Sequence, residues 1–314
     1  GYWMRSTLDG VFGIRSAIDG EHADELYDTL QDALAQPRLR PRALLREFRI
    51  EVIATTDDPL DPLEVHRRIA ADPDIDAVVR PTFRPDAYID PANPRWAANV
   101  DALLSNGGGY DAYLDALRAH RRRFVDAGAT SADFGVVSPA TIELDRHDAA
   151  ALFATARRGG ATAAEKATFL AHMLFESARM SVEDGLVMTI HAGVLRNHHR
   201  PTFERFGADR GHDIPLPTTF VEGLRPLLER FGTEPSLRLI LFTVDETTYS
   251  REIAPLAGFY PSVFIGAPWW FLDAPDAARR FRAATVETAG FYRGSGFIDD
   301  TRAFLSIPAR HDMA

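Results

Sequence analysis

Leu237-Arg238-Leu239-Ile240-Leu241-Phe242-Thr243-Val244 is the most apolar run of the chain, and the acidic Asp245 follows it directly. The run has the length of a strand and falls short of the roughly 20 residues that a membrane-spanning helix needs. A near-continuous apolar run is typical of a strand buried on both faces of a parallel sheet. These residues therefore predict a central strand with a polar residue at its carboxyl end.

Similar apolar and β-branched runs recur along the chain and alternate with helical patterns. They predict further strands at residues 50–55, 77–83, 129–133, 186–191, 262–266 and 296–300. Amphipathic or alanine-rich spacing predicts helices at residues 61–71, 111–127, 163–183, 220–231 and 277–288, after a mainly helical part at residues 1–48. Strands separated by helices of this length indicate a parallel sheet with crossover helices.

Seven predicted strands fit either an open doubly wound sheet or a TIM-type (β/α)8 barrel that lacks one strand. Polar side chains stand at or just past successive strand ends, at Asp57, Arg84, Asp133, His191, Asp245, Trp269 and Asp300. A barrel gathers its functional groups on that face, whereas an open sheet concentrates them near one switch point. We therefore predict a single α/β barrel domain over residues 1–314. Residues 49–314 would supply strands 2 to 8, and the first strand would lie upstream of Gly1.

The composition excludes several classes of protein. The 314 residues include no Cys, which excludes a disulfide scaffold, a thiolate metal site and a cysteine nucleophile. Lys and Arg total 35 against 45 Asp and Glu, so the net charge is −10. This charge argues against binding to nucleic acid or to an anionic membrane surface, but a local pocket can still hold a small acid.

Several of the residues at strand ends have both a functional and a structural interpretation. Arg84 could hold a carboxylate, or could form an ion pair with a nearby aspartate, and Arg196, which follows His191, favours an anionic ligand. Asp133 could act as a general base or hold a substrate hydroxyl, or it could cap a helix. For His191 a metal ligand, an acid–base group and a hydrogen-bonded core histidine all remain open.

The last two strand ends carry Trp269 and Asp300. Trp269 could form the wall of a sugar pocket, or it could pack in the core. Asp300 could bind a metal or move a proton, or it could cap a helix. Position alone does not decide between these alternatives.

Taken in order, these segments resemble the uronate isomerase family of the amidohydrolase superfamily. The segments that carry the resemblance are residues 55–61, 83–86, Asp133, residues 191–197, 269–271 and 300–306, and Arg310-His311. The resemblance implies a distorted (β/α)8 barrel. It also implies interconversion of D-glucuronate with D-fructuronate and of D-galacturonate with D-tagaturonate, by a proton shift from C2 to C1 through a cis-enediol.

The resemblance also implies roles for individual residues. It implies catalytic roles for Asp300, Asp133, Arg302 and His191, and substrate-binding roles for Arg84, Arg196 and Trp269. Asp300 and His191 are expected to ligate a divalent metal, with zinc as the expected ion, bound weakly or not at all by this chain. The implied partner is a small hexuronate in the cytoplasm, and the protein could assemble as a homo-oligomer.

The sequence departs from the family's pattern in its metal-binding residues. The family's H-x-H strand is not found in the 314 residues, and Phe134 stands where the family often has His. We expect the chain to be a fragment of a longer protein whose remaining His ligands lie upstream of Gly1, because loss of one strand opens a barrel and exposes two sheet edges. Two alternative functions remain, namely a metal-dependent hydrolase of a lactone or amide and a non-catalytic binder of sugar acids.

Overall fold

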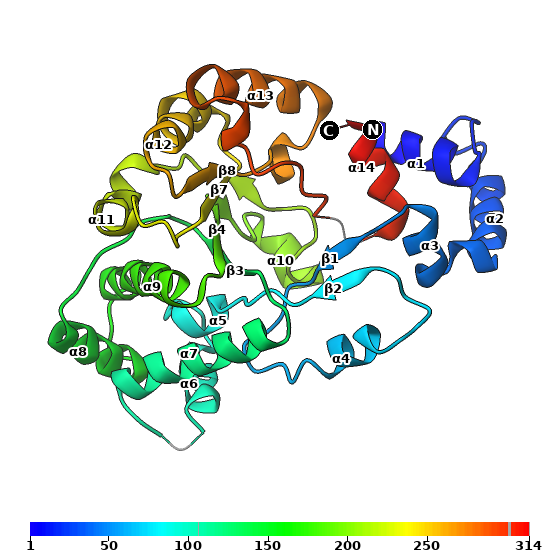
Figure 1. The fold of residues 1–314 in the computed structure, drawn as a ribbon. Helices are drawn as coiled ribbons and strands as arrows, with labels where there is room; N and C mark the ends of the chain where they lie inside the picture. Colours follow the sequence, from blue (N-terminus) through cyan, green and yellow to red (C-terminus); the bar gives the residue numbers. More distant parts are fainter. Residues whose placement is uncertain (106, 301–302, 314) are drawn as a thin grey trace. The chain divides into compact units, whose positions relative to one another are not determined.

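The computed structural model describes residues 1–105, 107–300 and 303–313 (Figure 1). The chain forms two compact units, and each is described by itself. Unit 1 comprises Gly1–Ala54, Glu64–Arg80 and Phe297–Ala314, and unit 2 comprises Thr55–Leu63 and Pro81–Gly296. Among the described residues, no helix combines the length and the apolar character that crossing a membrane requires.

Unit 1 is mainly helical. Its helices are α1 (Tyr2–Phe12), α2 (Ala23–Leu34), α3 (Pro41–Glu47), α4 (Glu64–Ala70) and α14 (Ile307–Met313), with short 3-10 turns η1 (Pro37–Leu39) and η6 (Phe304–Ser306). Two three-residue strands, β1 (Val52–Ala54) and β2 (Val78–Arg80), pair in parallel. A small core of Val11, Ala33, Leu39 and Leu44 holds the helices together.

Unit 2 is built on a parallel sheet of four strands. These are β3 (Ser131–Val136), β4 (Val187–Ala192), β7 (Leu239–Thr243) and β8 (Val263–Ile265), hydrogen-bonded in that order. Single parallel bridges extend the sheet on both sides: Asp57 to Phe83, Phe83 to Ala132, and Ile265 to Gly294. Neighbours in the sheet thus follow the order of the sequence, as in a barrel, without the reversal that marks a doubly wound sheet.

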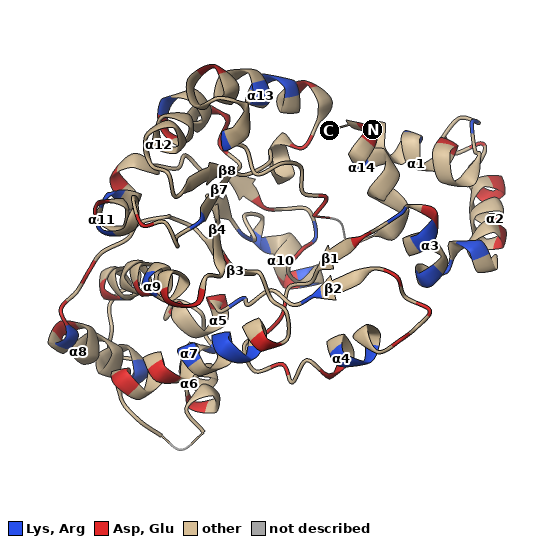
Figure 2. Cartoon of the chain, in the orientation of Figure 1, with Lys and Arg blue, Asp and Glu red and all other residues tan. Residues whose placement is uncertain are grey.

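Helices connect the strands of unit 2. The connections contain α5 (Asp86–Ile89), α6 (Trp96–Leu103), α7 (Tyr110–Asp126), α8 (Arg146–Arg157), α9 (Ala163–Asp184), α10 (Arg200–Phe206), α11 (Val221–Phe231), α12 (Ala254–Phe259) and α13 (Pro275–Ala289). Shorter turns are η2 (Glu246–Thr248), η3 (Tyr249–Ile253), η4 (Trp270–Leu272) and η5 (Phe291–Arg293), and β5 (Val194–Leu195) pairs antiparallel with β6 (Ile214–Pro215). Figure 2 shows acidic and basic residues interspersed along these helices.

The strands of unit 2 are buried as their sequences predict. Met188, Ile190, Leu239 and Val263 have no exposed side-chain surface, and they join one large core with residues from α7, α9 and α11. The apolar run that predicted a doubly covered strand forms β7, which lies inside the sheet between β4 and β8. The core therefore holds the strand ends, and the side chains beyond them, in a fixed register.

The structure differs from the sequence-based expectation at two strand boundaries. Residues 296–300, predicted as a strand, form none; Gly296 and Asp300 have positive φ values of 84° and 46°, which extended strands do not adopt. The third strand continues past Asp133 to Val136, because the buried Phe134 and Val136 keep pairing with β4. Asp133 therefore lies within the strand.

Candidate active site

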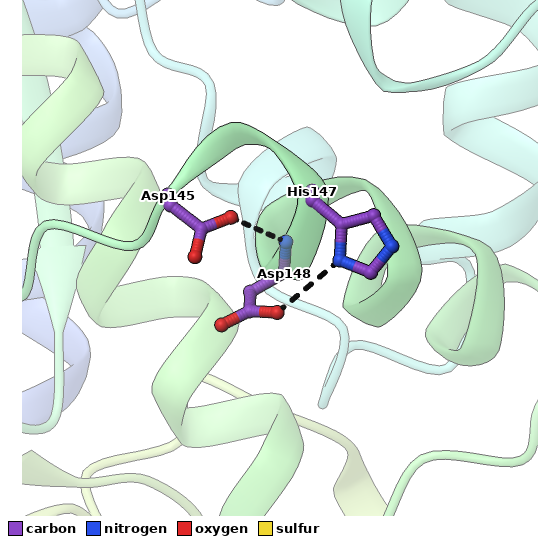
Figure 3. A group of neighbouring side chains, drawn as sticks. All are labelled: Asp145, His147 and Asp148. Carbon is purple, nitrogen blue, oxygen red and sulfur yellow. Dashed lines mark hydrogen bonds and ion pairs between the residues drawn. The ribbon is translucent and has the colours of Figure 1, made fainter.

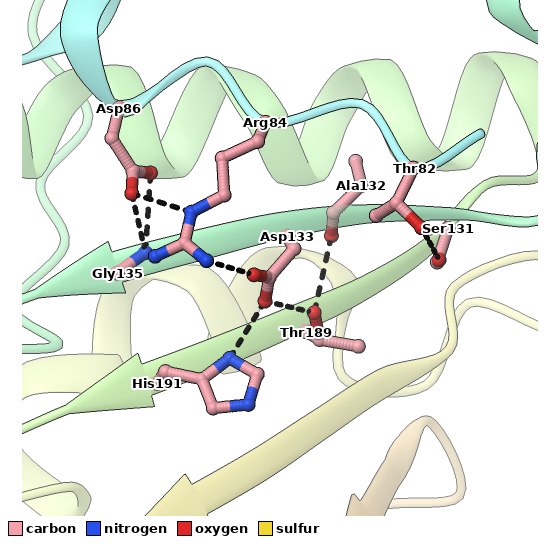
Figure 4. Close-up of polar contacts among 9 residues, drawn as sticks. All are labelled: Thr82, Arg84, Asp86, Ser131, Ala132, Asp133, Gly135, Thr189 and His191. Carbon is pink, nitrogen blue, oxygen red and sulfur yellow. Dashed lines mark hydrogen bonds and ion pairs between the residues drawn. The ribbon is translucent and has the colours of Figure 1, made fainter. Parts of the chain in front are cut away.

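Three polar side chains meet where β3 and β4 run side by side. In the parallel register Asp133 lies opposite Thr189, and Gly135 lies opposite His191. One carboxylate oxygen of Asp133, Oδ1, is 2.5 Å from the Thr189 hydroxyl and 2.6 Å from His191 Nδ1 (Figure 4). Thr189 and His191 are two residues apart on one strand, so their side chains project from the same face.

Arg84 joins this group from the segment after β2. Its Nη1 donates a 2.8 Å hydrogen bond to Asp133 Oδ2, and its Nε donates one of the same length to Asp86 Oδ2. Asp86 also accepts the backbone N–H of Gly135. The result is a continuous chain of hydrogen bonds from Asp86 through Arg84 and Asp133 to His191 (Figure 4).

The electrostatics keep Asp133 ionised. Burial alone would raise the pKa of this carboxyl, but His191, Arg84 and Thr189 together lower it to about 2. Because an ionised carboxylate can only accept hydrogen bonds, the proton shared with His191 belongs to Nδ1. Burial raises the pKa of Asp86, an effect that Arg84 opposes.

The His191 ring is held between aromatic neighbours. It stacks on Phe242 of β7, with ring centroids 4.2 Å apart, and meets the edge of Trp269 at 4.7 Å. The side chain is 18% exposed, and within the described residues nothing hydrogen-bonds its Nε2. His191 therefore has one fixed nitrogen and one nitrogen that a ligand can reach.

Arg196, a predicted substrate-binding residue, directly follows β5. Its Nη1 lies 3.1 Å from the buried carboxylate of Asp213 and 3.5 Å from the exposed carboxylate of Asp209. Its guanidinium stacks 4.6 Å above the Trp270 ring. The side chain is half exposed and positively charged, so the predicted role toward a carboxylate is compatible with this geometry.

Two other predicted site residues fall in unit 1 or outside the description. Asp300 belongs to unit 1 and adopts a left-handed backbone conformation. The preceding residue, Asp299, pairs with Arg310 at 3.1 Å and with His311 at 3.2 Å, both on α14. Arg302 lies outside the described residues. The roles predicted for Asp300 and Arg302 therefore remain predictions.

His191 has the arrangement expected of a metal-binding histidine. Histidines that ligate metals through one nitrogen commonly donate the other N–H to a carboxylate, as His191 does to Asp133. In the described residues, one group of three Asp or His ligand atoms lies within 4.8 Å, namely that of Asp145, His147 and Asp148 (Figure 3). All three are exposed, and Asp145 caps α8 by accepting the N–H of Asp148. This group could hold an ion, but it includes neither His191 nor Asp300.

Sequence reasoning missed three residues that shape the site. Thr189 and Phe242 lie inside strands, where threonine and phenylalanine are common for reasons of packing alone. Asp86 lies within the segment 83–86 that carried the family resemblance, so its position was noted without a role. The strand register brings Thr189 to Asp133 and Phe242 to His191, and the fold of the segment before α5 brings Asp86 to Arg84.

Comparisons with known proteins agree on one family. A family profile described as glucuronate isomerase matches residues 2–314. A uronate isomerase of Rhizorhabdus wittichii is 52% identical over 99% of the chain and 68% of its own length. The crystal structure of glucuronate isomerase from Caulobacter crescentus superposes with a TM-score of 0.94 at 45% identity, covering 99% of this chain and 66% of that one. The crystal structure of a uronate isomerase from Thermotoga maritima superposes with a TM-score of 0.92 at 29% identity, covering 99% of this chain and 69% of that one. The chain spans about two thirds of the length of these relatives.

Proposed function

The chain belongs to the uronate isomerase family, and we propose that it interconverts hexuronates, D-glucuronate with D-fructuronate and D-galacturonate with D-tagaturonate. The resemblance read from the motifs is thereby confirmed, and so is the α/β barrel class. The observation that carries the proposal is the 2.6 Å bond between His191 Nδ1 and Asp133, which leaves Nε2 to a ligand.

The reaction is a proton shift that needs no oxidant. A base removes the proton from C2 while the carbonyl oxygen on C1 gains one, which gives a cis-enediol. A proton then returns to C1 as the oxygen on C2 loses its own. An imidazole suits such work because its ordinary pKa lies near neutral pH.

His191 and its neighbours have properties suited to this chemistry. The ionised Asp133 fixes the ring and its tautomer, so that Nε2 faces away from the carboxylate and can hold or move a proton at the substrate. The Asp133 carboxylate has three donors already, from Thr189, His191 and Arg84, and therefore acts on the substrate through His191. We assign to Arg84, Arg196 and Trp269 the binding of the sugar acid, with its carboxylate toward a guanidinium.

The proposal includes a divalent metal, with zinc as the expected ion, for which His191 and Asp300 would be ligands. Such an ion, when bound, polarises the carbonyl oxygen as a Lewis acid. Asp300 and Arg302 complete the proposed catalytic set. The proposal further extends to a cytoplasmic location and to assembly as a homo-oligomer, which light scattering after size-exclusion chromatography tests.

Proton NMR in D2O tests the proposed reaction directly. The protein is incubated with D-glucuronate and then with D-galacturonate, with zinc or manganese added. We expect ketose signals and loss of the C2 proton signal, with the substrate's mass conserved except for deuterium. A hydrolase would instead release an acid group, and a binder would leave both sugars unchanged.

Matched variants assign any activity to the site. His191→Gln should abolish exchange, while His147→Gln, the same change at an exposed histidine of α8, should leave it intact. A folded, metal-supplied wild type that leaves the C2 proton of both sugars in place contradicts the proposed function for this chain.

A further inference from the structure

Asp86 is the end of the hydrogen-bonded chain that lies farthest from His191, and within that chain it contacts Arg84 and not His191. Its Oδ2 accepts Arg84 Nε at 2.8 Å, and both of its oxygens lie 3.1 Å from the Gly135 N–H. Asp86 is the first residue of α5, yet these bonds lead to β3 and to Arg84. The neighbouring Asp58 and Asp90, by contrast, accept N–H groups two residues further along their own segments.

Gly135 provides the space in which this contact forms. A Cβ atom built at Gly135 would overlap the Nη2 atom of Arg84 and approach Asp86 Oδ2 to 3.0 Å. The end of a free arginine could move aside, but Arg84 is held at both Nε and Nη1 by carboxylates. Any side chain at position 135 would therefore break one of these two ion pairs.

The arginine transmits orientation because its guanidinium is planar and rigid. When Asp86 fixes the Nε–H direction, the Nη1–H direction toward Asp133 Oδ2 is fixed as well. Asp133 is then held at both of its oxygens, which turns Oδ1 toward His191 Nδ1. A lysine ammonium is a compact charge whose three donors rotate, so it would not fix the directions of the two contacts relative to each other.

We propose that Asp86 is a positioning residue that, through Arg84 and Asp133, sets the orientation of the His191 imidazole, with Gly135 required to make room for the contact. The inference rests on the proposed function in one respect, because His191 is there the group that acts on the substrate. It adds a role for Asp86 and Gly135, and it gives Arg84 the further role of linking Asp86 to the carboxylate that orients His191.

The kinetic test uses Asp86→Asn on the full chain. The amide has only one acceptor oxygen and no charge, so in either orientation its NH2 faces a donor, Arg84 Nε–H or the Gly135 N–H, and the ion pair with Arg84 is lost. Loss of supporting partners around a functional histidine commonly costs about 10- to 100-fold in activity. We expect kcat to fall by that factor and KM to change less than about twofold. Asp90→Asn, the same change four residues along, is the matched control and should retain wild-type kcat.

A spectroscopic readout separates this inference from the proposed function. The His191 Nδ1 proton in its short bond to Asp133 should give a downfield signal in 15N-histidine-labelled protein, assigned by its loss in His191→Gln. We expect the signal to shift or broaden in Asp86→Asn and to stay in place in Asp90→Asn. This result stands even if the wild type proves inactive, in which case only the proposed function fails.

Gly135→Ala provides an independent second variant in case Asp86→Asn does not fold. It should move the same signal and lower kcat in the same direction, because the added methyl displaces Arg84. A wild type without the downfield signal overturns the inference. So does a folded variant of either kind in which both the His191 signal and kcat match Asp90→Asn.

Discussion

His191 and His172 are two histidines of unit 2, each with a hydrogen bond of 2.6 Å, and they behave as opposites. His191 Nδ1 bonds the carboxylate of Asp133, and its Nε2 stays open to a ligand. His172, 2% exposed on α9, bonds the hydroxyl of Tyr110 through Nε2, and its Nδ1 accepts the Leu144 N–H at 3.2 Å. Both nitrogens of His172 are thus occupied within the core.

The difference shows that the partner and the second nitrogen decide what a histidine can do. Asp133 is an ionised acceptor, so the shared proton lies on Nδ1. Around His172, burial lowers the pKa of the imidazole, and burial raises the pKa of Tyr110, so this pair is neutral. Hydrogen-bond length alone would have ranked the two histidines as equal.

The largest expected effect comes from removing the open nitrogen of His191. In His191→Gln we expect kcat/KM for the hexuronate to fall by at least about 100-fold, the range of acid–base catalysis by a positioned side chain. The unfolding midpoint should fall by a few degrees, because the ring packs on Phe242 and helps to keep Asp133 ionised, but the variant should stay folded at assay temperature. Steady-state rates and thermal unfolding measure the two quantities. A variant with more than a tenth of wild-type kcat/KM would place the acid–base role elsewhere.

The ionised state of Asp133 should appear as acid sensitivity of stability. Its folded-state pKa of about 2 lies below the ordinary value of about 3.9, so the unfolded chain takes up the proton first as pH falls. The contribution, about 2–3 kcal/mol, is present above pH 4 and is lost as pH falls toward 2. Urea unfolding of wild type and Asp133→Asn at several pH values measures it. A stability difference between the two proteins that does not change with pH contradicts the prediction.

For His172 the expected effect is on stability alone. Burial lowers its folded-state pKa, so protons bind the unfolded chain first below about pH 6.5 and the neutral histidine's contribution is lost as pH falls. In His172→Gln the loss of a buried hydrogen-bonded pair should cost about 1–3 kcal/mol at pH 7.5 and less at pH 5.5. Denaturant titrations at both pH values check this, and kcat should match wild type. A drop in kcat at unchanged stability would give His172 a functional role.

Thr189 should give the smallest effect. Thr189→Val removes the 2.5 Å hydrogen bond to Asp133 and keeps the shape of the side chain. One such bond contributes about 1 kcal/mol, so kcat/KM should fall about fivefold. Thr189→Ser, which keeps the hydroxyl, is the control and should remain within twofold of wild type. Equal rates in the valine and serine variants would show that His191 and Arg84 alone hold Asp133.

The sequence predicted the strands that the core buries and the residues that end them. The runs before His191 and Asp245 formed β4 and β7, because continuous apolar residues leave few alternatives to a doubly covered strand. The predicted end of the third strand at Asp133 was wrong, because an acidic residue after an apolar run usually marks the end of a buried strand, whereas β3 continues to Val136. The strand at residues 296–300 was also wrong, because positive φ at Gly296 and Asp300 depends on tertiary surroundings.

The candidate site could be predicted as single residues but not as a network. His191 and Asp133 stand at recognisable positions, whereas their contact depends on the register of β3 against β4. The Asp86–Arg84 contact depends on the missing side chain of Gly135, which no periodicity reveals. Strand register and the room left beside Gly135 arise only when the chain is packed, so the pattern of residues along the sequence cannot predict them.

The parallel pairing of β3 and β4 also fixes when the site can exist during folding. Arg84 and Asp133 are 49 residues apart in the chain, and Asp133 and His191 are 58 apart. Contacts between such distant residues close large loops and form late, after local helices. A refolding chain should regain helical circular dichroism before it regains the His191 environment. The site therefore forms only when the sheet is complete. A helical intermediate that precedes the sheet should not bind the substrate.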